Sequence, residues 1–496
     1  MQPFHTPFME FSSLTIAAAS QKLRSKEVKP SELVAAAIAR IEALDKTLNA
    51  VVYRNFERAL EKAKKLDAET PGPSELWGVP YLAKDVYCEA GVPTTACSNI
   101  LRDPVYVPPF DSTTTLRLNV AGAVSVGKAN TDEFTMGAST ETSCYGPTRN
   151  PWDTSRVAGG SSGGSAAGVA AGYCPFALGT DTGGSIRLPA SFCGCVGLRT
   201  TYGRTSRYGV MSMASSLDTI GPFARTVEDI AIVLRAIAGK DIRDATTADK
   251  PVPDYRAALA KGVNGMKIGM PKEYFIDGML PEVEKSVRAA ADVLRSLGAE
   301  IVDISLPHTK YGVATYYVIT PCEVSSNMAR YDGIRFGHTE EGTNSLTEYY
   351  ERVRSRGFGP EVKRRIMVGT YALSSGYYDA YYRKAQVARA RMKQDFEEAF
   401  KTVDAVISPT SPGVAFGVGA HADDPLAMYL EDVFMCPQPM AGIPALSVPC
   451  GFAERDGKQL PIGLQIMGPQ WGEETVLRVG HAYEEVSGLR GKMARM

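Results

Sequence analysis

The feature that most constrains this chain is a glycine- and serine-rich stretch from Val157 to Ser191, VAGGSSGGSAAGVAAGYCPFALGTDTGGSIRLPAS. It holds two glycine-flanked serine clusters, Ser161-Ser162 and Ser185, with an apolar segment between them. Such a composition is typical of flexible linkers, but the small apolar residues at 166–171 predict a helix and residues 175–178 predict a short buried strand. The glycines are therefore interpreted as turns on a packed scaffold.

Turns of this kind suit a particular chemistry. Successive backbone N–H groups can converge on one point, and the missing side chains let a substrate carbonyl approach closely. A developing oxyanion needs such a group of donors. The candidate donors are the backbone amides of Thr182, Gly183, Gly184 and Ser185.

Three mechanisms compete for these serines. Residues 160–164 match G-x-S-x-G, but the preceding TSRVA is too short and polar for the strand that a nucleophile elbow requires. A phosphate-binding loop needs Gly-Lys-Ser/Thr, which does not occur here. None of the histidines lies in a setting that marks it as a base: His5, His308, His338, His421 and His481. A serine nucleophile without histidine needs another base, and a desolvated lysine is the usual one.

Three motifs carry a resemblance to a known family: GVPYLAKD, GGSSGGSAAGVAAG and GTDTGGSIRLPASFCG, in that order. They resemble the amidase signature family of serine amidohydrolases, over nearly the whole chain. The resemblance implies that Ser185 is the nucleophile, Ser161 is a bridging serine after a cis peptide bond from Gly160, and Lys84 is the base. It also implies that catalysis needs no metal and no organic cofactor.

Later segments resemble one branch of that family, the glutamine-hydrolysing subunits of tRNA-dependent amidotransferases. These segments are RYDGIRFG, VKRRIMVGTYALSSGYYDAYYRKAQ and DDPLAMYLEDVF. The resemblance implies that Arg365 binds the α-carboxylate of glutamine, Asp432 binds its α-ammonium group, and Tyr316 helps to close the pocket. A planar guanidinium and a carboxylate are the partners that a free amino acid needs, although each charge taken alone is more often part of a surface ion pair.

The same resemblance implies partners. Subunits B and C of the amidotransferase and a mischarged tRNA would act with this chain, and ATP and magnesium would bind at a partner subunit. Two alternatives stay open. A stand-alone amidase for small carboxamides would share the catalytic serines but would not need Arg365 or Asp432, and a non-catalytic binding subunit would keep only the fold.

Composition and charge limit the classes of protein to which this chain can belong. The chain has 496 residues with 54 basic and 55 acidic side chains, so no overall field draws nucleic acid or a membrane surface. Nine cysteines without C-x-x-C spacing indicate reduced thiols, with Cys193 and Cys195 as buried apolar side chains. The N-terminus is not typical of a signal peptide, and no apolar run is long enough to span a bilayer. We therefore expect a cytoplasmic protein that does not contact a membrane.

Strands and helices alternate along much of the chain, which predicts an α/β fold with a large mixed central sheet covered by helices on both faces. We expect one domain over 1–496, including a helical N-terminal segment at about 1–70. Expected helices are 31–44, 56–68, 112–120, 281–297, 313–328, 474–487 and one long helix that continues to about Phe400; expected strands include 123–128, 266–270, 404–408, 461–467 and one ending near Lys84. The polar segment 130–151 is predicted to form a wall of the pocket.

Overall fold

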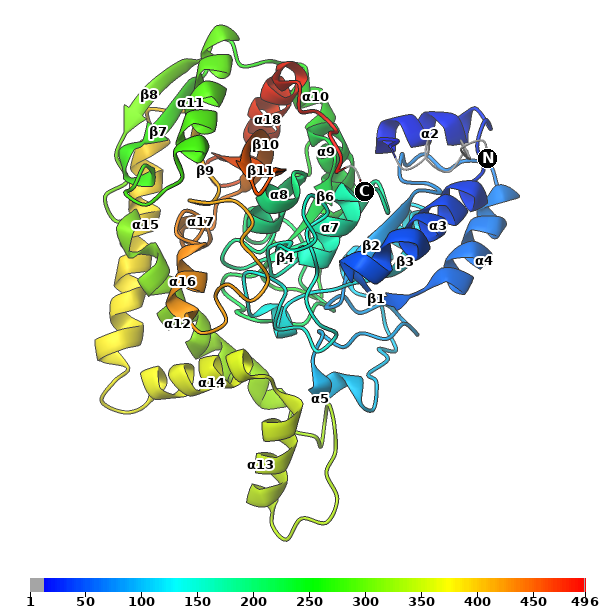
Figure 1. The fold of residues 1–496 in the computed structure, drawn as a ribbon, viewed down its shortest axis with the longest axis vertical. Coiled ribbons are helices and arrows are strands. Elements are labelled where there is room, and N and C mark those ends of the chain that lie inside the picture. Colours follow the sequence, from blue (N-terminus) through cyan, green and yellow to red (C-terminus); the bar gives the residue numbers. More distant parts are fainter. Residues whose placement is uncertain (1–12, 495) are drawn as a thin grey trace.

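The structure, a computed structural model, describes residues 13–494 and 496. Its centre is a mixed sheet of eleven strands in the order β1-β3-β2-β4-β6-β5-β10-β11-β9-β7-β8 (Figure 1). The strands are β1 Val51–Arg54, β2 Pro80–Lys84, β3 Val124–Ala129, β4 Phe176–Asp181, β5 Val196–Arg199, β6 Thr219–Ala224, β7 Lys267–Pro271, β8 Glu300–Ile304, β9 Ala405–Pro409, β10 Ala445–Arg455 and β11 Lys458–Met467.

The sheet combines parallel and antiparallel pairs. Strand β2 runs parallel to both β3 and β4, and β7 runs parallel to both β8 and β9. The antiparallel hairpin β10–β11 lies between these two parts, because β10 pairs with β5 and β11 pairs with β9. Helix α11, Pro281–Ser296, connects β7 to β8, which makes a parallel strand-helix-strand unit.

Helices lie on both faces of the sheet, and the predicted α/β class is confirmed (Figure 1). They are α2 Ile16–Arg24, α3 Pro30–Leu48, α4 Phe56–Asp67, α5 Asn99–Arg102, α6 Thr113–Val120, α7 Gly163–Ala170, α8 Arg187–Cys193, α9 Val227–Ile237, α10 Tyr255–Leu259, α11 Pro281–Ser296, α12 Gly312–Asn327, α13 Leu346–Gly357, α14 Pro360–Leu373, α15 Lys384–Ala399, α16 Pro425–Leu430, α17 Pro437–Ala441 and α18 Glu473–Ser487. Short 3₁₀ turns occupy Glu133–Thr135, Lys272–Tyr274, Thr309–Tyr311 and Met328–Arg330.

Helix α7 explains the composition of the glycine-rich stretch. Every residue of α7 is buried. A Cβ atom added at Gly168 would lie 2.8 Å from a side-chain carbon of Leu82 on β2, so the helix packs against that strand only because its residues are small. The stretch therefore contains a packed helix followed by the buried strand β4, as the sequence predicts.

One predicted element is wrong. The long helix expected to run to Phe400 is interrupted, since α14 ends at Leu373 and α15 begins only at Lys384. Gly376, in the connection, has a φ of +86°, which is outside the helical range, and a π-helical turn over Asp379–Arg383 follows it. The change of direction here separates α14 from α15 (Figure 1).

Most of the other predicted elements occur within a few residues of their expected bounds. Helix α6 begins with a side-chain cap, because the Ser112 hydroxyl accepts a hydrogen bond from the backbone N–H of Thr115 at 3.1 Å. Cys193 and Cys195 are buried, and all nine cysteines are free thiols. Within the described residues, no helix combines the length and apolarity needed to cross a membrane. The single-domain assignment stays a prediction, and the first twelve residues of its helical segment lie outside the described part.

Candidate active site

Lys84 ends strand β2 and is fully buried. Its Nζ atom lies 2.7 Å from the Ser161 hydroxyl, 2.8 Å from the Ser162 hydroxyl and 2.9 Å from the Thr180 hydroxyl. Burial lowers the pKa of Lys84 to about 7, although nearby carboxylates such as Asp132 oppose the shift. A substantial fraction of this amine is therefore neutral near pH 7, as a general base requires.

The loop before α7 holds Ser161 in a fixed position. The peptide bond between Gly160 and Ser161 is cis, as the resemblance implies. The Ser161 carbonyl accepts the backbone N–H of Asp132 at 3.2 Å, and the Thr140 hydroxyl donates to the Gly159 carbonyl at 2.9 Å. A Cβ atom at Gly160 would lie 2.3 Å from Oδ2 of Asp132, so no larger residue fits there. Segment 130–151 thus packs directly on the serine loop.

Ser185 follows strand β4 and lies beside the same loop. Its backbone carbonyl accepts the N–H of Ser162 at 3.2 Å, and only 7% of the residue is exposed. Among the residues that the structure describes, no hydrogen bond is formed by the Ser185 hydroxyl. The hydroxyl is therefore free to react with a substrate, next to the group formed by Lys84 and Ser161.

The four amides proposed for the oxyanion hole differ in the structure. The Gly184 N–H donates to Oδ1 of Asp181 at 3.1 Å, so it is occupied within the turn. In the described part of the chain, the N–H groups of Thr182, Gly183 and Ser185 have no hydrogen-bond partner. These three amides are the available donors, and Gly184 contributes by shaping the turn, with a φ of +142°.

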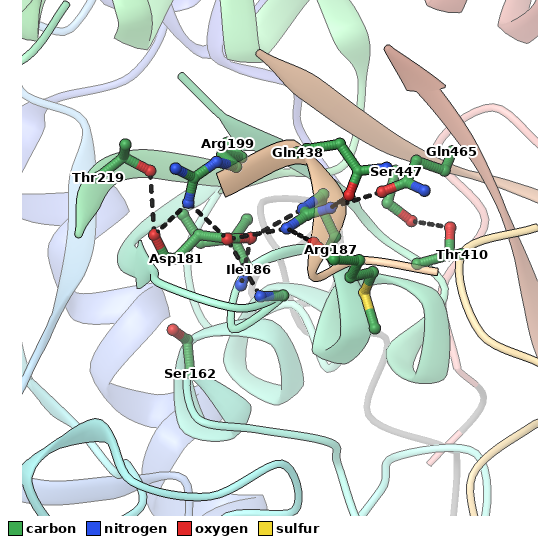
Figure 2. A network of polar contacts seen from close by, with 12 residues as sticks. Ser162, Asp181, Ile186, Arg187, Arg199, Thr219, Thr410, Gln438, Ser447 and Gln465 are labelled. Atoms are coloured by element: carbon green, nitrogen blue, oxygen red, sulfur yellow. Dashed lines mark hydrogen bonds and ion pairs between the residues drawn. The ribbon is translucent and has the colours of Figure 1, made fainter. Parts of the chain in front are cut away.

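Figure 2 shows the polar network that fixes this turn. Asp181 receives Nε of Arg187 at 3.0 Å, Nη1 of Arg199 at 2.9 Å and the N–H of Ile186 at 3.3 Å. Burial alone would raise the pKa of Asp181, but the two guanidinium groups lower it below its usual range, so the carboxylate stays charged. Arg187 also donates to the side chains of Gln438 and Gln465 and to the Met435 carbonyl.

The sequence interpretation did not include this network. Asp181 and Arg187 both lie inside the GTDTGGSIRLPAS motif, and two opposite charges among otherwise small or apolar residues are the signal that could have identified them. The side chains of Asp181, Arg187 and Arg199 are all fully buried.

Arg365 lies on α14 and is only 4% exposed. Its Nε atom donates to Glu361 Oε1 at 2.8 Å, and its guanidinium lies 5.3 Å from the ring centre of Tyr317 and 5.8 Å from that of Tyr429. The two rings stack with centres 3.8 Å apart, and the Tyr429 hydroxyl donates to Glu361 Oε1 at 3.0 Å. Glu361, Tyr317 and Tyr429 hold the guanidinium and were not predicted.

The other two predicted substrate residues, Asp432 and Tyr316, both adjoin Tyr317. The Tyr317 hydroxyl donates to Oδ2 of Asp432 at 3.4 Å, and burial raises the pKa of Asp432 to about 8, against the opposing effect of Arg365. The adjacent Tyr316 covers the oxyanion turn, because a Cβ atom at Gly183 would lie 2.5 Å from Cζ of Tyr316. Neighbouring tyrosines of α12 therefore join the serine group to the Arg365 group.

A cavity of about 250 Å³ opens onto Arg365 and Tyr317. Six residues of the segment 130–151 line it, which agrees with the predicted pocket wall: Glu133, Gly137, Ala138, Ser139, Glu141 and Thr142. None of the described histidines hydrogen-bonds to the serine loop or to Ser185. His308, His338 and His421 instead pair with carboxylates of Asp395, Glu340 and Glu431, and His5 lies outside the described residues.

The fold and the site are those of an amidase. Comparison with known proteins agrees, because the Amidase family model matches residues 32–477. The chain therefore belongs to this family. Two similar proteins are A subunits of glutamyl-tRNA(Gln) amidotransferase. The one from Roseiflexus sp. (strain RS-1) is 54% identical, covering 97% of this chain and 98% of its own, and the one from Moorella thermoacetica is 55% identical, covering 96% and 97%. The crystal structure of the corresponding A subunit from Thermotoga maritima has a TM-score of 0.80 and 41% identity, covering 96% of this chain and 95% of its own.

Proposed function

We propose that this chain is the glutamine-hydrolysing subunit of a tRNA-dependent amidotransferase. It would release ammonia from glutamine for the conversion of Glu-tRNA(Gln), Asp-tRNA(Asn) or both to the amidated forms. The observation that carries the proposal is that the buried side chains of Arg365 and Asp432 meet at Tyr317, whose neighbour Tyr316 covers the turn that leads to Ser185. The names of the relatives support the same function.

The catalytic step begins with neutral Lys84. Its amine takes a proton from Ser161, Ser161 takes one from Ser185, and the Ser185 oxygen attacks the side-chain amide carbon of glutamine. The resulting oxyanion is bound by the free backbone amides of the turn. The C–N bond then breaks, the leaving nitrogen takes a proton back along the relay, and ammonia departs. Water attacks the ester on Ser185 and releases glutamate.

The hydrogen bonds around Lys84 support this direction of proton flow. A neutral amine has two N–H donors and one lone pair. The Ser162 hydroxyl donates its own proton to the Thr180 carbonyl at 3.2 Å, so its oxygen can accept one N–H from Lys84, and the Thr180 hydroxyl can accept the other. The lone pair is then left for the proton of Ser161.

Substrate recognition follows from the paired charges. The Arg365 guanidinium would bind the α-carboxylate of glutamine, and Asp432 would bind its α-ammonium group. Because burial holds the pKa of Asp432 near 8, a cation beside this carboxyl is needed to keep it fully ionised at neutral pH. Tyr316 would close the pocket over the oxyanion turn.

The remaining steps belong to partners. We propose that subunits B and C supply the binding of mischarged tRNA and the activation of its carboxylate, that ATP and magnesium bind at one of these partners, and that the complex is cytoplasmic. The near-zero net charge of this chain and its lack of a Gly-Lys-Ser/Thr phosphate loop support that division. No cofactor and no metal is proposed for this chain itself.

The test is Ser185→Ala in the assembled enzyme. Glutamine hydrolysis should be lost, because the hydroxyl that forms the acyl-enzyme is removed, while transamidation with added ammonium salt should continue. Ammonia release and amidated tRNA are measured separately. Glutaminase activity retained in Ser185→Ala would refute the assignment of the nucleophile.

The stand-alone amidase is tested on the unmodified protein. If the isolated chain hydrolyses simple carboxamides as well as it hydrolyses glutamine, the Arg365 and Asp432 pair has no role in recognition, and the stand-alone amidase is the better description.

A further inference from the structure

Glu133 is a buried carboxylate that the reaction above does not use. It is 3% exposed and belongs to the segment that packs on the serine loop. Its Oε1 atom accepts the Ser98 hydroxyl at 2.5 Å, and its Oε2 atom accepts the backbone N–H of Gly359 at 2.8 Å. Both oxygens are thus engaged in holding other parts of the chain.

The residue held by Oε2 is the N-cap of α14, the helix that carries Arg365. Ser98 reinforces the same junction, because its hydroxyl also lies 3.3 Å from the Gly357 carbonyl. Contact at Gly359 is so close that an added Cβ atom would lie 2.4 Å from Glu133 Oε2. Glu133 therefore fixes where α14 begins.

The neighbouring residue holds the catalytic side. Asp132 donates its backbone N–H to the Ser161 carbonyl at 3.2 Å, and its carboxylate accepts the N–H of Thr140 at 2.8 Å. Adjacent residues thus point to the two halves of the site, Asp132 to the serine loop and Glu133 to α14. The distance between the reacting serines and the Arg365 guanidinium is set through this dipeptide.

We propose that Glu133 is a positioning residue that holds Arg365 at the spacing that fits glutamine, and so contributes to discrimination against shorter amides such as asparagine. The inference rests on the proposed function, because it assumes that Arg365 binds the α-carboxylate. Glutamine exceeds asparagine by one methylene group, so a fixed distance between the carboxylate-binding and amide-attacking groups distinguishes them. When α14 is free to shift, that distinction weakens.

The role depends on hydrogen bonding and not on charge. A glutamine side chain at position 133 can accept the Gly359 N–H through its oxygen and donate to the Ser98 oxygen through its nitrogen, leaving the Ser98 proton for the Gly357 carbonyl. Burial also raises the pKa of Glu133 to about 7, so the neutral carboxyl already occurs in the native protein near neutral pH.

The first test compares Glu133→Ala with Glu133→Gln in the full chain assembled with its partner subunits. For Glu133→Ala we expect the KM for glutamine to rise about tenfold with kcat changed less than about threefold, and the preference for glutamine over asparagine to fall by about tenfold, the scale of one methylene group. Glu133→Gln should restore both values to near those of the unmodified enzyme. Equal losses with glutamine and asparagine, or no rescue by Glu133→Gln, would overturn the inference.

A second variant, Gly359→Ala, disturbs the contact between Gly359 and Glu133 from the side of helix α14. Gly359 has a φ of −72° and a ψ of 171°, which alanine adopts without strain, so Gly359→Ala acts only by displacing the Glu133 carboxylate. It should reproduce the rise in KM and add nothing further in the Glu133→Ala background. Additive effects would show that the two residues act separately and would contradict the proposal, and this variant decides the question if Glu133→Ala does not fold.

A third measurement tests whether Glu133 acts through Arg365. In the Arg365→Ala background, Glu133→Ala should cause no further loss in kcat/KM for glutamine, because there is no guanidinium left to position. A full additional loss would rule out action through Arg365. If the unmodified assembly hydrolyses no glutamine, the proposed function fails instead, so the two failures are distinguishable.

Discussion

At the scale of single residues, the environment of Lys84 decides whether the chemistry can occur at neutral pH. Three hydroxyl groups surround its Nζ atom and no carboxylate forms an ion pair with it in the described structure. A lysine paired with a carboxylate would stay protonated and could not act as a base. Desolvation without an ion pair is the physical reason that the pKa falls to about 7.

This predicts the pH dependence of the reaction. The base is the neutral form, so kcat at saturating glutamine, where the substrate ammonium keeps Asp432 ionised, should fall as the pH decreases through about 7 and level off above it, as measured by ammonia release across buffers of equal ionic strength. Lys84→Arg stays protonated at every accessible pH and should be as inactive as Lys84→Ala. Turnover by Lys84→Arg near that of the unmodified enzyme would exclude the relay.

Residues named from motifs were found more readily than residues that support them. Lys84 contacts Ser161, Ser185 lies beside the same loop, and Arg365, Asp432 and Tyr316 lie around α12 and α14, while their catalytic and binding roles stay predictions. Glu133 and Glu361 were missed because a lone glutamate in a polar segment is usually exposed, and nothing local to it shows which backbone it will meet after folding.

At the scale of elements, the turn after β4 depends on a buried charge cluster. Two arginines, Arg187 and Arg199, share the carboxylate of Asp181. Removing the carboxylate leaves both guanidinium groups buried without a counter-ion, which costs far more than the cluster itself contributes. The backbone amides of the turn would lose their support at the same time.

We therefore expect Asp181→Asn to lower the free energy of unfolding by about 3–5 kcal/mol, measured by denaturant titration followed by circular dichroism. Glutamine hydrolysis should also be lost at temperatures where the variant is folded, since the oxyanion turn is no longer fixed. Glu61→Gln, on an exposed ion pair with Lys65, is the matched control and should leave the midpoint nearly unchanged. A midpoint for Asp181→Asn equal to that of the control would contradict this account.

Sequence patterns predicted elements well where periodicity is strong and poorly where backbone geometry decides. Helices α3, α11 and α18 were expected within a few residues of their bounds. Strand β10 was not predicted, because Pro449 and a change of register before Gly451 break its alternation. The interruption between α14 and α15 was missed because a single glycine in a helical pattern is often tolerated.

At the scale of the whole molecule, the site is built from segments that lie far apart in the sequence. Helices α14 and α16, Tyr317 of α12 and the segment 130–151 surround the cavity at Arg365, while Lys84 lies at the end of strand β2. Free hydrolysis would waste glutamine and release ammonia to solvent. A pocket completed only in the complex would prevent that.

We expect slow glutamine hydrolysis by the isolated chain and a marked rise in kcat/KM when subunits B and C, mischarged tRNA and ATP are all present. Steady-state ammonia release from the chain alone and from the assembly is the measurement, with the Ser185→Ala assembly as the blank. Equal turnover by the isolated chain and the full assembly would show that no such coupling exists.

The position of the hairpin β10–β11 has a consequence for synthesis on the ribosome. These strands come from the last part of the chain but lie in the middle of the sheet, between β5 and β9. Until residues 445–467 have emerged, the strands made first and those made later have no backbone partners in common, and two open sheet edges remain exposed. Arg187 also lacks its hydrogen bond to Gln465 until these residues have emerged. A prematurely terminated chain therefore lacks this support of the oxyanion turn. The nascent protein can thus become an enzyme only when it is nearly complete.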